Sequence, residues 1–72
     1  MKDSTKIIAN NLKHIRKKSG MTQEELSKKT GVSRSYIANI ECGRKHSMSI
    51  QTLQKLSDKL DVCIYDLLEG IE

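Results

Sequence analysis

The sequence contains no proline, phenylalanine or tryptophan, and only two tyrosines. Strands favour aromatic and β-branched residues, whereas the β-branched residues here are spread among Lys, Leu, Glu and Ser. The absence of proline also removes the residue least compatible with helices. These features predict an all-α fold.

Cysteine is scarce as well, since Cys42 and Cys63 are the only two and make no disulfide framework. The polar start, MKDSTK, leads into no long apolar run, so neither a signal peptide nor a membrane span is predicted. We therefore expect a cytoplasmic protein without a membrane partner.

Motifs of catalysis are missing too. The chain has no glycine-rich phosphate loop, no paired carboxylates and no nucleophile motif, so we expect no enzyme and no cofactor. Two cysteines and two histidines could in principle hold zinc: His14, Cys42, His46 and Cys63. Structural zinc sites usually contain a close pair of cysteines, but these two are about twenty residues apart, so no metal is expected.

The 72 residues are predicted to form one domain, residues 1–72. The apolar residues are periodic, which argues against disorder. The net charge of +4 is compatible with a polyanionic partner, although many soluble domains carry such a charge.

Helical periodicity and start and stop signals predict five helices. They cover about Thr5–Ser19, the residues after Thr22 to Thr30, Arg34 to about Cys42, the residues after Ser49, and about Cys63–Glu69. The expected inner face of the first contains Ile8, Leu12, Ile15 and Ser19. That of the fourth contains Ile50, Leu53, Leu56, Ser57 and Leu60.

The segment from about 22 to 42 meets the requirements of a helix-turn-helix. Thr22 and Glu25 have the spacing of a capping box, and Gly31 tolerates the positive φ of a tight turn. Apolar residues are available to pack the two helices together: Leu26, Val32, Ile37 and Ile40.

The second helix of this pair has a polar outer face that contains Arg34, Ser35 and Asn39. Arginine bonds guanine in a bidentate manner, asparagine does the same to adenine, and serine bonds either kind of base edge. The segment therefore predicts base contacts in the major groove. A merely solvated polar face is the plainer alternative.

Phosphate contacts are expected to flank this face, with candidates Gln23, Ser33, Tyr36, Arg44 and Lys45. Gln23 begins a helix, where backbone amides favour anions. For Tyr36, packing is an equal alternative to a phosphate bond. Lys17 and Lys18 are weaker candidates.

The stretch MTQEELSKKTGVSRSYIANIECGR resembles the helix-turn-helix of lambda-repressor-like (Xre- or Cro-type) regulators. The segment from Arg34 to Val62 is most similar to controller proteins of restriction–modification systems. The resemblance implies a five-helix bundle, a homodimer and a two-fold symmetric operator in double-stranded DNA. It places Gln23 on phosphate and Arg34, Ser35 and Asn39 at base edges. Cys42 departs from the usual amide or charged residue, which puts a phosphate bond from that position in doubt.

The resemblance also implies a structural ion pair between Arg16 and Glu41. The helical wheel supports this pairing, because it places Glu41 on the inner side of its helix, where a carboxylate needs a partner.

Dimerisation is expected through the apolar residues near the C-terminus: Val62, Ile64, Tyr65, Leu68 and Ile71. The alternative is that these residues complete the core of the monomer. Two other functions stay open, a protein-interaction module of the same fold and an antitoxin-type regulator. No small-molecule effector is implied.

Overall fold

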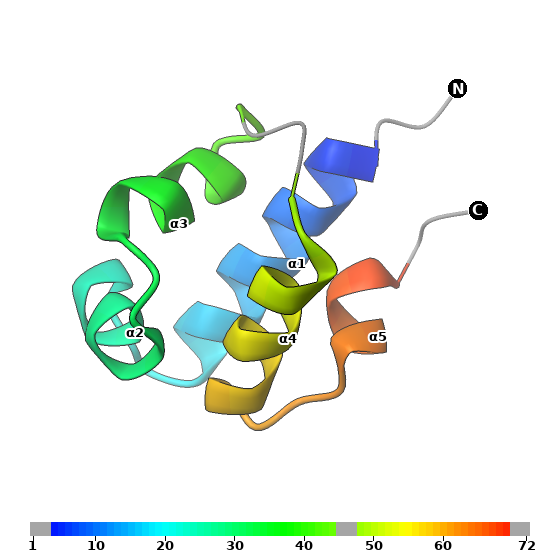
Figure 1. Ribbon diagram of the computed structural model, residues 1–72. Helices are drawn as coiled ribbons and strands as arrows, with labels where there is room; N and C mark the ends of the chain where they lie inside the picture. The colour runs from blue at the N-terminus through cyan, green and yellow to red at the C-terminus, as the bar shows by residue number, and fades with distance from the viewer. Residues whose placement is uncertain (1–3, 45–47, 70–72) are drawn as a thin grey trace.

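The computed structural model describes residues 4–44 and 48–69, and these residues form five α-helices and no strand (Figure 1). The helices are α1 (Ser4–Lys18), α2 (Gln23–Thr30), α3 (Arg34–Glu41), α4 (Ile50–Lys59) and α5 (Ile64–Leu68). The predicted all-α fold is confirmed. None of these helices is long and apolar enough to cross a membrane.

Helix α2 is fixed at both ends by local interactions. At its start, the N–H of Glu25 donates to Thr22 Oγ1 at 3.0 Å, and the N–H of Thr22 donates to Glu25 Oε1 at 2.9 Å. At its end, Gly31 has φ 78° and donates its N–H to the carbonyl of Ser27. Glycine has no Cβ and adopts this conformation without steric cost, so the chain turns sharply into α3 at this point.

Helices α3 and α4 begin at serine caps. The hydroxyl of Ser33 accepts the N–H of Tyr36 at 3.1 Å, and that of Ser49 accepts the N–H of Thr52 at 3.0 Å. Such a cap is worth about 1 kcal/mol, because it satisfies a backbone donor that the helix leaves free.

All five helices contribute to one hydrophobic core. Its buried members are Ile8, Leu12, Leu26, Ile37, Ile40, Leu53, Leu56, Leu60 and Leu67. Helix α1 packs against both α3 and α5, while α2 packs against α3 and α4. As Figure 1 shows, α2 and α3 therefore lie on one side of the molecule and α5 on the opposite side.

Two details of the predicted inner faces are wrong. Ile50 is 65% exposed, although it falls on the apolar stripe of α4, and Ser19 is exposed beyond the last residue of α1. Periodicity identifies the face of a helix but not how far the neighbouring helices extend along it. Helix α1 also begins one residue earlier than predicted and ends one residue earlier.

Candidate nucleic-acid interface

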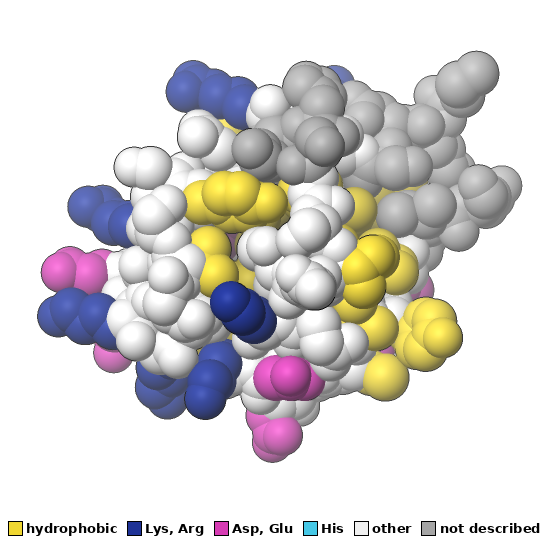
Figure 2. Space-filling view, in the orientation of Figure 1, with side chains coloured by type: hydrophobic (Ala, Val, Ile, Leu, Met, Phe, Trp, Pro, Cys, Tyr) yellow, Lys and Arg dark blue, Asp and Glu magenta, His cyan; other side chains and the backbone are white. Residues whose placement is uncertain are grey.

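Helix α3 has two chemically different faces. Ile37 and Ile40 are fully buried in the core, whereas Arg34, Ser35 and Asn39 are exposed. The inner face is thus held rigidly while the outer face is free to contact a partner. Lys and Arg side chains gather over α2 and α3 on the left of Figure 2.

The exposed face of α3 offers the groups that base recognition needs. The guanidinium of Arg34 forms no hydrogen bond or ion pair with other described residues, so its donors are available. Arg34 also lines an open hollow of about 560 Å³, together with Lys17 and Thr22. This hollow lies beside the first turn of α2, where free N–H groups and the helix dipole favour an anion.

The residues predicted to contact phosphates differ in their surroundings. Arg44 and Ser33 are exposed, but the hydroxyl of Ser33 serves as the cap of α3. Tyr36 is half-buried and packs against the core, which was one of its two predicted roles. Lys45 lies outside the described residues.

Gln23 has a partner that sequence reasoning missed. The side chain is half-buried, and its Nε2 donates to Oε1 of Glu41 at 3.2 Å. No local pattern signals this bond, because the two residues are 18 positions apart. A side-chain amide has two N–H donors, so one remains for a phosphate.

The side chains of Arg16 and Glu41 are in direct contact, and each residue is only 8% exposed. Arg16 Nε donates to Oε2 of Glu41 at 2.6 Å, and Nη2 donates to Oε1 at 2.9 Å. The hydrogen bond to Glu41 raises the pKa of Arg16 above its ordinary value. This bidentate geometry is the strongest form of a guanidinium–carboxylate contact.

The same guanidinium reaches a third segment, since Arg16 Nη1 donates to the carbonyl of Met21 at 2.7 Å. Glu41 also accepts the hydrogen bond from Gln23, which connects the ion pair to the start of α2. One charge cluster thereby joins α1, the turn before α2, α2 itself and the end of α3.

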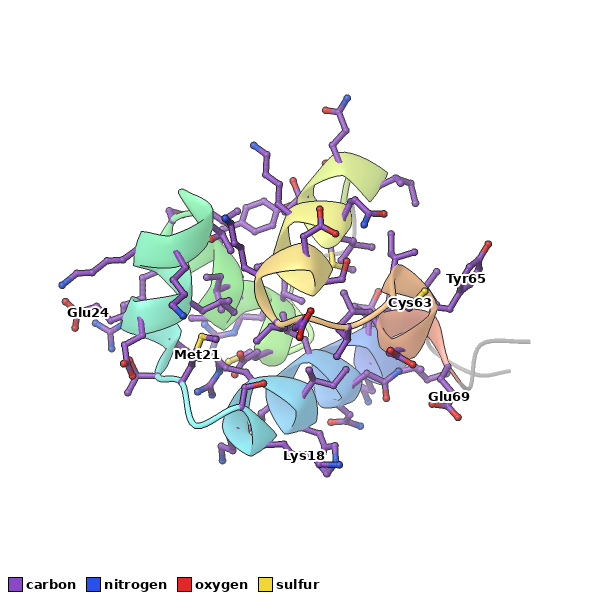
Figure 3. All side chains as sticks on the ribbon, turned by 90° about the horizontal axis from the view of Figure 1, so that it is seen from below. Lys18, Met21, Glu24, Cys63, Tyr65 and Glu69 are labelled. Carbon is purple, nitrogen blue, oxygen red and sulfur yellow. The ribbon has the colours of Figure 1, made fainter. Side chains whose placement is uncertain are left out.

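The residues predicted for dimerisation differ in how far they are exposed. Val62, Ile64 and Leu68 are half-buried and pack against the core of their own chain. Tyr65 is 75% exposed and points away from the helices in Figure 3. Ile71 lies outside the described residues. Among the described members of this set, Tyr65 is therefore the apolar group with the most surface left for a partner.

No three metal-ligand side chains come together within residues 4–44 and 48–69. Cys42 and Cys63, two of the four possible zinc ligands, are exposed free thiols, and His46 lies outside the described part of the chain.

Comparison with known proteins adds independent evidence. The helix-turn-helix family model matches residues 12–67. The transcriptional regulator SinR of Bacillus subtilis is 40% identical over 63 residues, which are 88% of this chain and 57% of that protein. The chain thus spans little more than half the length of this relative.

Two crystal structures share the fold. The hypothetical transcription factor NHTF from Neisseria has a TM-score of 0.86 and 30% identity, over 92% of this chain and 75% of that one. The restriction–modification controller protein C.AhdI from Aeromonas hydrophila has a TM-score of 0.83 and 28% identity, over 88% of this chain and 94% of that one.

Proposed function

The chain belongs to the helix-turn-helix family, and on this basis we propose that it is a transcriptional regulator that reads double-stranded DNA through the outer face of α3. The observation that carries the proposal is the separation of polar and apolar side chains onto opposite sides of α3. Arg34, Ser35 and Asn39 are exposed on one side, and the opposite side is anchored in the core. A partner-protein surface would instead favour exposed aromatic or aliphatic anchors at this position.

In the proposed complex, Arg34, Ser35 and Asn39 contact base edges. Arg44, Ser33 and the second amide proton of Gln23 contact the phosphates on either side, as do Lys45 and Tyr36. The Arg16–Glu41 pair contacts no DNA and instead holds α3 at the angle that the groove requires.

Selection of bound sequences from a random duplex pool tests the proposal. We expect enrichment of a two-fold symmetric consensus. Arg34→Ala should weaken binding to that consensus by about 1–3 kcal/mol and relax the preference at one base pair. Lys13→Ala is the matched control, because Lys13 is an exposed cation outside α2 and α3.

Two results would count against DNA reading. If the Arg34 variant kept the wild-type preference at every position, Arg34 would not be a base contact. If no sequence were enriched even at low salt, the protein-interaction alternative would be favoured instead. The complex of SinR with SinI shows that a relative of this chain binds a second protein.

We further propose that the regulator binds as a homodimer through the α5 surface. Two modules about 34 Å apart read successive major grooves, which one small module does not achieve alone. Tyr65→Ala should raise the dimer dissociation constant by tenfold or more, about 1.4 kcal/mol, because aromatic anchors dominate interfaces. Ile50→Ala is the control, since Ile50 is the other large exposed apolar residue in the described part of the chain and lies at the start of α4.

The finer proposal is a controller of a restriction–modification system. It is supported by C.AhdI and by the controller protein C.Esp1396I, which has a TM-score of 0.82 and 28% identity. The selected consensus should then occur upstream of a restriction or modification gene beside the coding sequence. If no such gene lies there, a general or antitoxin-type regulator is favoured.

A further inference from the structure

The outer face of α3 has an apolar centre. Successive residues of a helix are rotated by about 100°, which places Ala38 between Arg34 on one side and Ser35 on the other. Asn39 lies beyond Ser35. Ala38 is half-buried, whereas its three polar neighbours on this face are exposed. A methyl group therefore lies among polar side chains that reach further out.

The peptide groups of Ala38 are not available to a partner. Its carbonyl accepts the N–H of Cys42 at 2.9 Å, and its own N–H lies in the interior of α3, where the helix provides an acceptor four residues earlier. The methyl group is thus all that Ala38 offers. A polar base edge pressed against this methyl group would lose water and gain no hydrogen bond, which weakens binding.

The bases present mostly hydrogen-bond donors and acceptors in the major groove. The exception is the C5 methyl group of thymine, which favours apolar contacts such as an alanine side chain. This methyl group and that of Ala38 match in polarity. They can approach closely, because alanine adds nothing beyond its Cβ.

We infer that Ala38 reads the C5 methyl group of a pyrimidine in the major groove. The inference rests on the proposed DNA reading by α3, and it adds the chemical class of base that the centre of this face selects. Thymine carries the methyl group in unmodified DNA, and 5-methylcytosine carries it in methylated DNA.

Helix geometry predicts where this pyrimidine lies. Ala38 follows Arg34 by four residues, which is about 6 Å along the helix axis, and stacked base pairs are about 3.4 Å apart. The pyrimidine therefore lies within about two base pairs of the one that Arg34 contacts. Because Arg34→Ala should relax the preference at one base pair, that variant identifies the window to search.

Base analogues in the selected consensus duplex test the inference with the wild-type protein. Each thymine in the window is replaced in turn by deoxyuridine, which lacks the methyl group and keeps the pairing. We expect one position at which affinity falls by about fourfold, the scale of burying one methyl group. At the same position, 5-methylcytosine should bind more tightly than cytosine by a similar factor.

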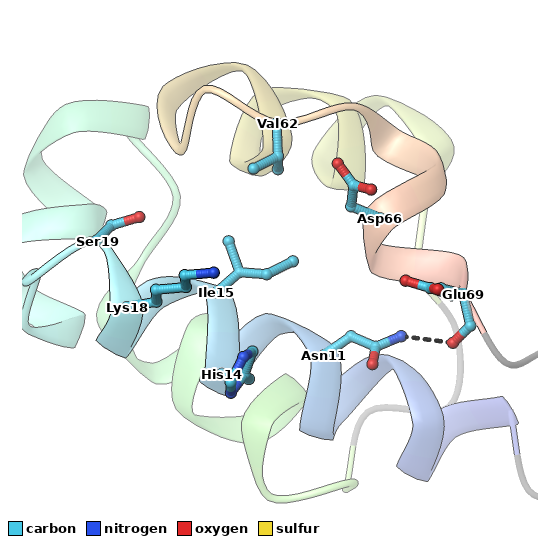
Figure 4. Close-up of a pocket in the computed structure, with 8 residues that line it drawn as sticks. All are labelled: Asn11, His14, Ile15, Lys18, Ser19, Val62, Asp66 and Glu69. Atoms are coloured by element: carbon cyan, nitrogen blue, oxygen red, sulfur yellow. Dashed lines mark hydrogen bonds between the residues drawn. The ribbon is translucent and has the colours of Figure 1, made fainter.

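Ala38→Gly then assigns the effect to this side chain, because the variant should no longer distinguish thymine from deoxyuridine. His14→Gly is the matched control, since it also places a glycine inside a helix, where glycine is unfavourable. His14 is exposed on α1 in an open groove between α1 and α5, which Lys18 and Glu69 also line (Figure 4). This control should keep the wild-type difference. Circular dichroism establishes that both variants are folded.

If neither methylated base gains affinity over its unmethylated counterpart anywhere in the window, the inference is wrong. It is also wrong if Ala38→Gly keeps the difference, because another side chain then reads the methyl group. A gain with thymine alone confines the contact to thymine, and a gain with both bases shows that the methyl group itself is read. The wild-type comparisons decide the matter even if the glycine variant does not fold.

Failure of the proposed function gives a different result. No sequence is then enriched from the random duplex pool, and both proposals fall. An enriched consensus without any methyl effect rejects the role of Ala38 alone and leaves the DNA reading by α3 intact.

Discussion

Replacing Glu41 with alanine is expected to destabilise the fold severely. The substitution leaves the Arg16 guanidinium almost fully buried, with the carbonyl of Met21 as its only remaining partner among the bonds described above. Removing one partner of a buried ion pair costs about 3–5 kcal/mol, because a charge remains without compensation. A domain has about 0.05–0.15 kcal/mol of stability per residue, or about 4–11 kcal/mol for these 72 residues.

The loss is therefore comparable to the whole stability of the domain. For a chain of this size, 1 kcal/mol corresponds to about 4–8 °C, so Tm should fall by at least about 12 °C in thermal unfolding followed by circular dichroism. Glu24→Ala is the matched control. Glu24 pairs with Lys28 at 3.8 Å, but both side chains are well exposed, and such a pair is worth at most about 0.5 kcal/mol.

A second variant distinguishes the effect of the unpaired charge from the effect of lost side-chain volume. Arg16→Met combined with Glu41→Leu removes both charges and keeps apolar volume, so it should be more stable than Glu41→Ala alone. A wild-type Tm for Glu41→Ala would refute the reasoning. Equal losses in Glu41→Ala and Glu24→Ala would show that burial of the pair does not matter.

Two further predictions concern the DNA contacts and the cap of α2. Arg44→Ala should weaken binding to all duplexes alike and reduce the slope of log K against log salt by about 0.9, as expected for one phosphate contact; an unchanged slope removes Arg44 from that role. For Glu25, hydrogen bonds from Thr22 lower the pKa below the ordinary 4.5. A carboxylate whose pKa is lower in the folded state than in the unfolded state contributes stability when the pH is above its unfolded-state pKa. This contribution is lost as the pH falls through the folded-state pKa. Glu25→Gln should thus have a lower Tm than wild type at pH 7, and the two should converge once the pH has fallen below the folded-state pKa of Glu25; a constant difference contradicts the assignment.

Much of the fold follows from local signals in the chain. Thr22 and Glu25 have the capping-box spacing and form both of its bonds, and Gly31 has the positive φ that the turn requires. These features depend on residues within one or two turns of one another, so their physics is contained in short stretches of sequence. The polar and apolar faces of α3 follow in the same way from the helical period.

The long-range partnerships were decided by tertiary structure. Asn11 reaches carbonyls 56 and 58 residues away, and no side-chain pattern predicts a bond to a backbone group at that distance. The sequence predicts a phosphate contact for Gln23 and gives no sign of a second partner, yet packing of α2 against α3 brings it to Glu41. The exposure of Ile50 likewise depends on where neighbouring helices end.

The sequence by itself thus determined the elements, their caps and the chemistry of the α3 face, because each arises from neighbours along the chain. Only the tertiary structure decided that Glu41 accepts hydrogen bonds from both Arg16 and Gln23. It also decided that Lys18 and Glu69 line one groove. Both depend on helices that meet after the chain has folded, and the distances between such helices are set by packing of the whole core.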